Sequence, residues 1–275
     1  MLLGGATVAD DTGQRESGFF PQNTQVVWSA PTGKSLIAPS VNDGGLVKRS
    51  STDPAQRLDV SFLADTTAAG YHPAGRAIVA AGVDDNGTGG VFLASNVGKD
   101  PKVLALYDQQ ESAVDEVAFD ESGSHLFFLH HHADGTEHVH QLGLPDLGLT
   151  TLYEAPGRKV GRLAVSSVDE QTAAWQIGAG SDGASVSTAI AGVIGSVDIG
   201  VPGATLEPIG WLPGHRLVVV QRPAGNPDGV GSVWIWNADN ASATKLVDGA
   251  GRVAVRVVRG PYQELPDQIA EQAPG

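Results

Sequence analysis

Five of the eight histidines of the chain lie in one short segment, FFLHHHADGTEHVHQL, from Phe127 to Leu142. Imidazole nitrogens are common ligands of zinc, copper and nickel in proteins, so this segment is a candidate metal site. It also has the pattern of a β-hairpin, because Asp-Gly separates two runs that suit strands. Which histidines could meet therefore depends on which of them share one face of the hairpin.

A two-residue turn at Asp134–Gly135 predicts that His131 lies opposite His138. Because strand side chains alternate between faces, His131, His138 and His140 would then share one face and could bind one ion together. The alternative interpretation is an ordinary hairpin with polar or packed histidines, because the sequence fixes no carboxylate or fourth ligand nearby. The predicted metal ligands are thus His131, His138 and His140, and no further cofactor is expected.

An acidic run, DEVAFDESG, offers a second candidate chemistry. Its carboxylates come from Asp115, Glu116, Asp120 and Glu121. A glycosidase needs two carboxylates that face each other across a sugar, so the run keeps a carbohydrate-active hydrolase or lectin open as an alternative function. The competing interpretation, which we prefer, is a solvated strand end.

The composition indicates many short strands joined by tight turns. The chain has 275 residues with 36 glycines, 16 prolines and only 17% charged residues, which suits a large all-β domain. It contains no cysteine, which excludes disulfides and thiolate chemistry. Its net charge of −14 with no basic stripe argues against a nucleic-acid partner, and no apolar run is long enough for a membrane helix.

An internal repeat is the strongest signal for the fold. Residues 71–94, YHPAGRAIVAAGVDDNGTGGVFLA, align without a gap with residues 119–142, FDESGSHLFFLHHHADGTEHVHQL. Looser copies span residues 28–47, 163–190 and 211–236, and their turn glycines recur every 43 to 48 residues. This period, built from strands and glycine turns, is typical of a β-propeller blade. The glycines are Gly44, Gly87, Gly135, Gly183 and Gly229.

The two ends of the chain suggest how such a propeller closes. Residues 253–258, VAVRVV, resemble an innermost strand, and residues 3–20 resemble the strands that would follow it. We therefore expect six blades, with five as the alternative, one of them shared by the N- and C-terminal strands. Residues 1–260 would form a single propeller domain and residues 261–275 a polar tail. The first residues, MLLGGATVADD, read either as the end of a trimmed signal peptide or as a first β-strand.

The two best repeats resemble the TolB-type, WD40-like propeller repeat. That repeat has the order aromatic, Ser-Pro-Asp-Gly, apolar strand, Asp-Gly turn and apolar strand, although HPAG and DESG replace its first turn here. The resemblance implies a propeller that binds other proteins, usually outside the cytoplasm, and it implies no catalytic residues. We expect a monomeric, non-enzymatic scaffold, extracytoplasmic and of bacterial origin, that docks a protein or peptide. Metal binding through the 131–140 hairpin is a further alternative.

Overall fold

The structure is a computed structural model that describes part of the chain. Its described residues are 2–3, 7–9, 15–16, 27–28, 35–39, 45–50, 56–58, 60, 63–75, 77–95, 102–110, 112–178, 183–226, 229–251 and 253.

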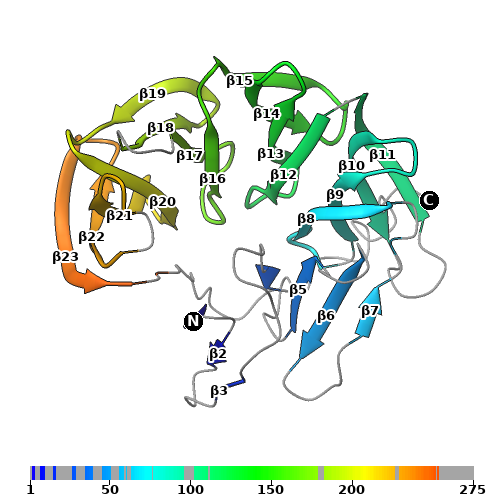
Figure 1. The fold of residues 1–275 in the computed structure, drawn as a ribbon, viewed down its shortest axis with the longest axis horizontal. Coiled ribbons are helices and arrows are strands. Elements are labelled where there is room, and N and C mark those ends of the chain that lie inside the picture. Colours follow the sequence, from blue (N-terminus) through cyan, green and yellow to red (C-terminus); the bar gives the residue numbers. More distant parts are fainter. Residues whose placement is uncertain are drawn as a thin grey trace. The chain divides into compact units, whose positions relative to one another are not determined.

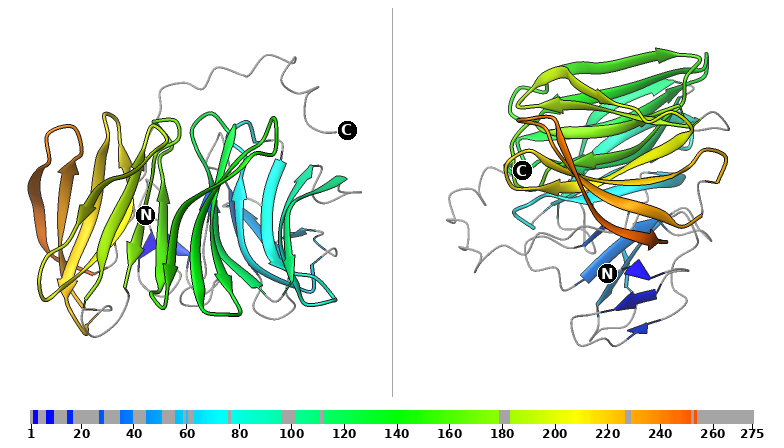
Figure 2. Two further views of the ribbon diagram at one scale, coloured as in Figure 1. Left: turned by 90° about the horizontal axis from the view of Figure 1, so that it is seen from above. Right: turned by 90° about the vertical axis from the view of Figure 1, so that its left-hand side faces the viewer.

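Every regular element among these residues is a β-strand, as predicted (Figure 1). Five four-stranded sheets and one three-stranded sheet are described, and all the strand pairs with a given register are antiparallel. In each sheet the strands follow one another in chain order, which is the up-and-down arrangement of a propeller blade. Figure 2 shows the strands of these sheets side by side and twisted.

The first three sheets in chain order contain mostly short strands. The three-stranded sheet contains β1 (Leu2–Leu3), β2 (Thr7–Ala9) and β3 (Arg15–Glu16). The next contains β4 (Val27–Trp28), β5 (Ser35–Pro39), β6 (Leu46–Ser50) and β7 (Gln56–Leu58). It is followed by β8 (Asp65–Tyr71), β9 (Ala77–Val83), β10 (Thr88–Ser95) and β11 (Lys102–Gln110).

The later sheets are longer and are described almost throughout. One contains β12 (Ser112–Phe119), β13 (His125–His132), β14 (Thr136–Gly143) and β15 (Leu149–Pro156). Another contains β16 (Val160–Val165), β17 (Ala173–Ile177), β18 (Ser185–Ile190) and β19 (Val193–Ile199). The last contains β20 (Ala204–Leu212), β21 (Arg216–Pro223), β22 (Gly231–Asn237) and β23 (Ser242–Ala250).

The repeat found in the sequence is a repeat of structure. Strands β9 and β13 begin 48 residues apart, and so do β10 and β14. Three of the predicted hairpin glycines, Gly87, Gly135 and Gly183, have positive φ angles of 80°, 82° and 94°. Glycine adopts this conformation without the clash that a Cβ atom causes, which is why it recurs at these turns.

The chain divides into two compact units, each with its own buried residues. One unit comprises Asn23–Gly135, His140–Leu149 and Val258–Gly275, and the other comprises Met1–Gln22, Thr136–Val139 and Thr150–Val257. The division does not test the expectation of one domain over residues 1–260, which stays a prediction.

Small and branched apolar residues fill the first of these units. Val79 and Val91 pack with Val117 and Phe128, so that β9 and β10 share a core with β12 and β13. In the other unit Trp211 and Trp236 pack against Val186, among other side chains. Trp175, Trp211 and Trp236 are all buried and contribute to the cores of their sheets.

Several expectations about the chain ends fall outside the described residues. The predicted inner strand at residues 253–258 is described only at Val253, and the tail at 261–275 is not described. The sharing of one blade by the two ends therefore stays a prediction, as does the number of blades. Short strands do occur in the first segment, at Leu2–Leu3 and Thr7–Ala9. Within the described part of the chain no helix is long and apolar enough to cross a membrane.

Candidate functional site

The turn of the histidine hairpin determines which imidazoles meet. It spans His132–Gly135 and is closed by a hydrogen bond from the Gly135 N–H to the His132 carbonyl, 3.0 Å long. Gly135 has a positive φ angle, whereas Asp134 does not. A two-residue type I′ turn would need positive φ at both of its central residues, so this is a type I turn followed by a left-handed glycine. The turn begins one residue earlier than the sequence analysis placed it.

This shift changes the face on which each histidine lies. The sister hairpin has the same turn, with the Gly87 N–H bonded to the Asp84 carbonyl. There Gly82 pairs with Gly90, and these positions align with His130 and His138. Because the two hairpins share this turn, we infer that His130, and not His131 as predicted, lies opposite His138. A register shift of one residue moves a strand's side chains to the opposite face.

Four imidazoles gather on the face that results. His130, His132, His138 and His140 each offer one ring nitrogen, and these four nitrogens all lie within 4.8 Å of one another. The rings of His130 and His132 are 3.9 Å apart between centroids, and those of His130 and His140 are 5.6 Å apart. His130 and His140 are buried, while the other two are partly exposed. Among the described residues no other group of three or more potential ligands is this compact.

Aromatic side chains surround the two buried histidines. The Tyr107 hydroxyl, from β11, lies 2.9 Å from His130 Nδ1. The Phe128 ring lies 5.1 Å from that of His140, between centroids. Burial raises the pKa of Tyr107 to about 12, so its hydroxyl stays protonated at neutral pH.

His131 lies apart from this group. Its Nε2 is 2.8 Å from the Asp115 Oδ2, on the neighbouring strand β12. Of the three predicted ligands, the structure brings His138 and His140 together and groups them with His130 and His132, while His131 lies outside the group. The two missed histidines could have been found from the sister hairpin if a three-residue loop ending in glycine had been considered for both copies.

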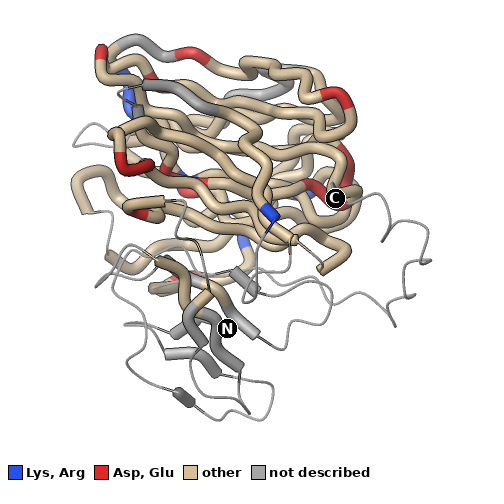
Figure 3. The backbone as a smooth tube through the Cα atoms, turned by 90° about the vertical axis from the view of Figure 1, so that its right-hand side faces the viewer, with Lys and Arg blue, Asp and Glu red and all other residues tan. Residues whose placement is uncertain are grey.

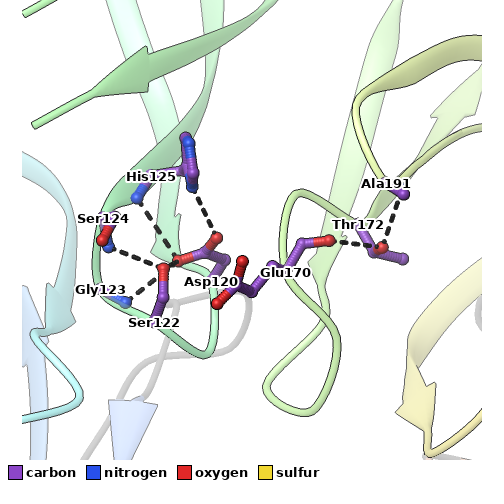
Figure 4. Close-up of polar contacts among 8 residues, drawn as sticks. All are labelled: Asp120, Ser122, Gly123, Ser124, His125, Glu170, Thr172 and Ala191. Atoms are coloured by element: carbon purple, nitrogen blue, oxygen red, sulfur yellow. Dashed lines mark hydrogen bonds and ion pairs between the residues drawn. The ribbon is translucent and has the colours of Figure 1, made fainter.

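The acidic run holds a turn together. Asp120 is buried and its Oδ1 accepts hydrogen bonds from the Ser122 hydroxyl at 2.8 Å and the Gly123 N–H at 3.0 Å. Its Oδ2 lies 2.9 Å from His125 Nδ1 (Figure 4). An aspartate closes a different turn, the one that joins β9 to β10, in a similar way: the Asp84 Oδ1 accepts from the backbone N–H of Asn86 and of Thr88, at 2.8 Å each.

These contacts bear on the carbohydrate-hydrolase alternative. A retaining or inverting glycosidase needs two carboxylates available to one sugar. Asp115 and Asp120 are each engaged by a histidine, and Asp120 also closes its turn. These contacts of Asp115 and Asp120 thus lie within their own sheet and turn, and the carbohydrate-hydrolase alternative stays a prediction.

Comparison with known proteins places the fold. No family model and no curated protein sequence matches the chain. A solved TolB structure from Agrobacterium tumefaciens matches with a TM-score of 0.60 and 17% identity, over 82% of this chain and 80% of that one. TolB from Acinetobacter baumannii matches with a TM-score of 0.60 and 16% identity, over 90% of this chain but only 60% of that one.

An enzyme is among the similar structures as well. Oligogalacturonate lyase in complex with manganese matches with a TM-score of 0.59 and 13% identity, over 87% of this chain and 71% of that one. At such identities the likeness shows the fold alone. From its antiparallel four-stranded sheets, its 48-residue structural repeat and these neighbours, the chain is an all-β protein with a TolB-like β-propeller fold.

Proposed function

We propose that this chain is a non-catalytic scaffold that docks a protein or peptide partner. The observation that carries the proposal is the likeness of its fold to two TolB structures. A propeller presents many loops on a rigid framework and requires no chemistry of its own, which suits it to binding.

The use of the polar side chains supports binding over catalysis. Two of the four carboxylates in the acidic run, those of Asp115 and Asp120, make contacts within their own sheet. Many acidic positions lie at the turns that join strands (Figure 3). With a net charge of −14, the complementary partner surface is basic. We further propose that the protein works outside the cytoplasm, as a monomer in its free state.

A two-step binding experiment tests this proposal. The intact, untagged chain is immobilised and exposed separately to the envelope and cytoplasmic fractions of its source cells. The captured protein is then purified, and its binding is measured by calorimetry at low and high NaCl. We expect a saturable one-to-one complex, with a partner from the envelope fraction and an affinity that falls as salt increases.

An enzymatic assay tests the alternative function, that of a carbohydrate-active enzyme. The same preparation is incubated with a panel of acidic and neutral oligosaccharides, and product formation is followed by chromatography. Cleavage that scales with protein concentration and survives repurification would replace the scaffold by a carbohydrate-active enzyme. A captured protein that binds the heat-unfolded chain equally well would also contradict the proposal.

A further inference from the structure

We propose that His130, His132, His138 and His140 form a binding site for one divalent transition-metal ion, of which Zn²⁺ is the best match. The four side chains lie on one hairpin, and their candidate ligand nitrogens are within 4.8 Å of one another. This site is independent of the proposed docking function, because it concerns a different ligand.

The ligand set fits a borderline-soft ion. Four neutral imidazoles suit zinc, copper or nickel, whereas magnesium and calcium prefer oxygen ligands. Zinc binds histidine nitrogen at about 2.0–2.1 Å in a tetrahedron, which separates the ligand nitrogens by about 3.3 Å. The candidate nitrogens lie up to 4.8 Å apart, so binding would draw them together through rotation of side chains, of which His132 and His138 are partly exposed.

The fold does not itself require histidines at these positions. In the sister hairpin the aligned residues are Gly82, Asp84, Gly90 and Phe92. A Cβ atom at Gly90 would lie 2.6 Å from the Phe92 ring, so that hairpin is filled by an aromatic side chain where this one carries imidazoles. A shared backbone therefore accommodates quite different side chains, and the grouping of four ligands is particular to β13 and β14.

The surroundings have the features of an outer shell for a metal site. Ligand histidines commonly donate their second ring N–H to an oxygen, which fixes the ring and the tautomer. The Tyr107 hydroxyl lies 2.9 Å from His130 Nδ1, an arrangement that presents Nε2 of His130 as the ligand. Tyr107 and Phe128 also pack on the His140 ring and shield that side from water. Glu154 brings a carboxylate oxygen 4.0 Å from His138 Nε2, which favours a cation nearby.

The expected role of the ion is structural. Four protein ligands complete a tetrahedral zinc site and leave no position for a substrate, as in closed structural sites. The ion would join β13 to β14 beyond their turn and so stabilise the hairpin.

Zinc titration of the untagged chain, with matched variants, tests the site. The variants His132→Gln and His138→Gln each remove a partly exposed ligand, and His131→Gln is the control in the same hairpin, outside the group. Calorimetry gives stoichiometry and Kd, and the thermal unfolding midpoint is measured with and without zinc. Circular dichroism of each zinc-free variant checks that it is folded. Cobalt substitution adds the visible absorption of a tetrahedral ion.

We expect one zinc per chain in wild type and in His131→Gln, with the unfolding midpoint raised by at least about 5 °C at saturation. Each of the two ligand variants should bind zinc at least about tenfold more weakly. Equal weakening by His131→Gln, or equal binding by wild type and both folded ligand variants, would overturn the proposal. A visible spectrum typical of octahedral rather than tetrahedral cobalt would also overturn the proposal.

Discussion

Gly123 lies at a turn where both backbone conformation and space call for glycine. Its φ angle is 73°, and a Cβ atom there would lie 2.4 Å from His72 Nε2. The Gly123→Ala variant should therefore lose about 2–4 kcal/mol of unfolding free energy, from backbone strain together with displacement of the His72 ring. Urea unfolding at neutral pH measures the loss.

Gly87 is the matched control for this prediction. It has a similar φ angle of 80°, but nothing lies within 4 Å of its would-be Cβ atom. Gly87→Ala should cost only the backbone strain, about 1–2 kcal/mol. If the two variants lose the same amount, the contact with His72 contributes nothing.

His72 should make stability depend on pH. Burial lowers its pKa below the ordinary value of 6.5, and the Gly123 backbone hydrogen bond and the Asp120 charge oppose this only in part. The Nδ1 atom accepts a hydrogen bond from the Ala74 N–H at 3.2 Å, which requires the neutral ring. The unfolded chain thus takes up the proton first as pH falls, so this contribution to stability is complete above pH 6.5 and is lost progressively below it.

The His72→Asn variant tests this contribution. Asparagine keeps an acceptor for the Ala74 N–H but does not titrate. The free energy of unfolding, measured on either side of pH 6.5, should fall less steeply with acid in the variant than in wild type. An equal or steeper fall in the variant would show that His72 is not a source of the acid sensitivity.

At the scale of elements, Arg222 of strand β21 forms an ion pair with the neighbouring strand β20 and hydrogen bonds with two backbone carbonyls. Its side chain is only 6% exposed and is paired with Glu207 of β20. Its Nε donates to the Gly229 carbonyl at 2.9 Å, and a terminal nitrogen donates to the Gly251 carbonyl at 2.7 Å. Glu207→Gln would leave a buried guanidinium without its counter-charge and should cost about 1–3 kcal/mol of unfolding free energy.

Arg162 provides the comparison for that pair. Its Nε also lies near Glu207, at 3.3 Å, but its side chain is 54% exposed. Solvent screens such a contact, so Arg162→Gln should change stability by less than about 0.5 kcal/mol. Denaturant unfolding of both variants shows which ion pair of Glu207 contributes more to stability. A larger loss of unfolding free energy from Arg162→Gln than from Glu207→Gln would mean that the exposed pair with Arg162 is the more important one.

The sequence predicted the elements of the hairpins better than their registers. The gapless alignment of residues 71–94 with 119–142 follows from real structural equivalence, because aromatic, glycine and apolar positions recur with the blade. The turn after His132 was misplaced because both a two-residue loop and a three-residue loop are compatible with Asp-Gly. The φ angle of Asp134 and the hydrogen bond from the Gly135 N–H to the His132 carbonyl separate the two loops. A register difference of one residue then moves His131 out of the histidine group and brings His130 and His132 into it.

At the scale of the whole molecule, net charge should govern the response to salt. The chain carries 31 acidic against 17 basic residues, which gives −14 at pH 7. Mutual repulsion of like charges opposes the compact state, and added salt screens it. Raising NaCl from about 10 mM to about 150 mM shortens the screening distance from about 30 Å to about 8 Å, so the unfolding midpoint at pH 7 should rise.

The same experiment near the isoelectric point supplies its own control. The sequence pI is about 4.8, so close to pH 5 the net charge is small and the repulsion that salt relieves is nearly gone. The rise in midpoint with NaCl should therefore be much smaller there than at pH 7, even though the pairs at Glu207 and Asp248 remain exposed to the same screening. A midpoint that falls with salt at pH 7 would mean that local ion pairs outweigh the repulsion of the excess acidic residues, and that the acidity contributes to stability as well as to the charge offered to a partner.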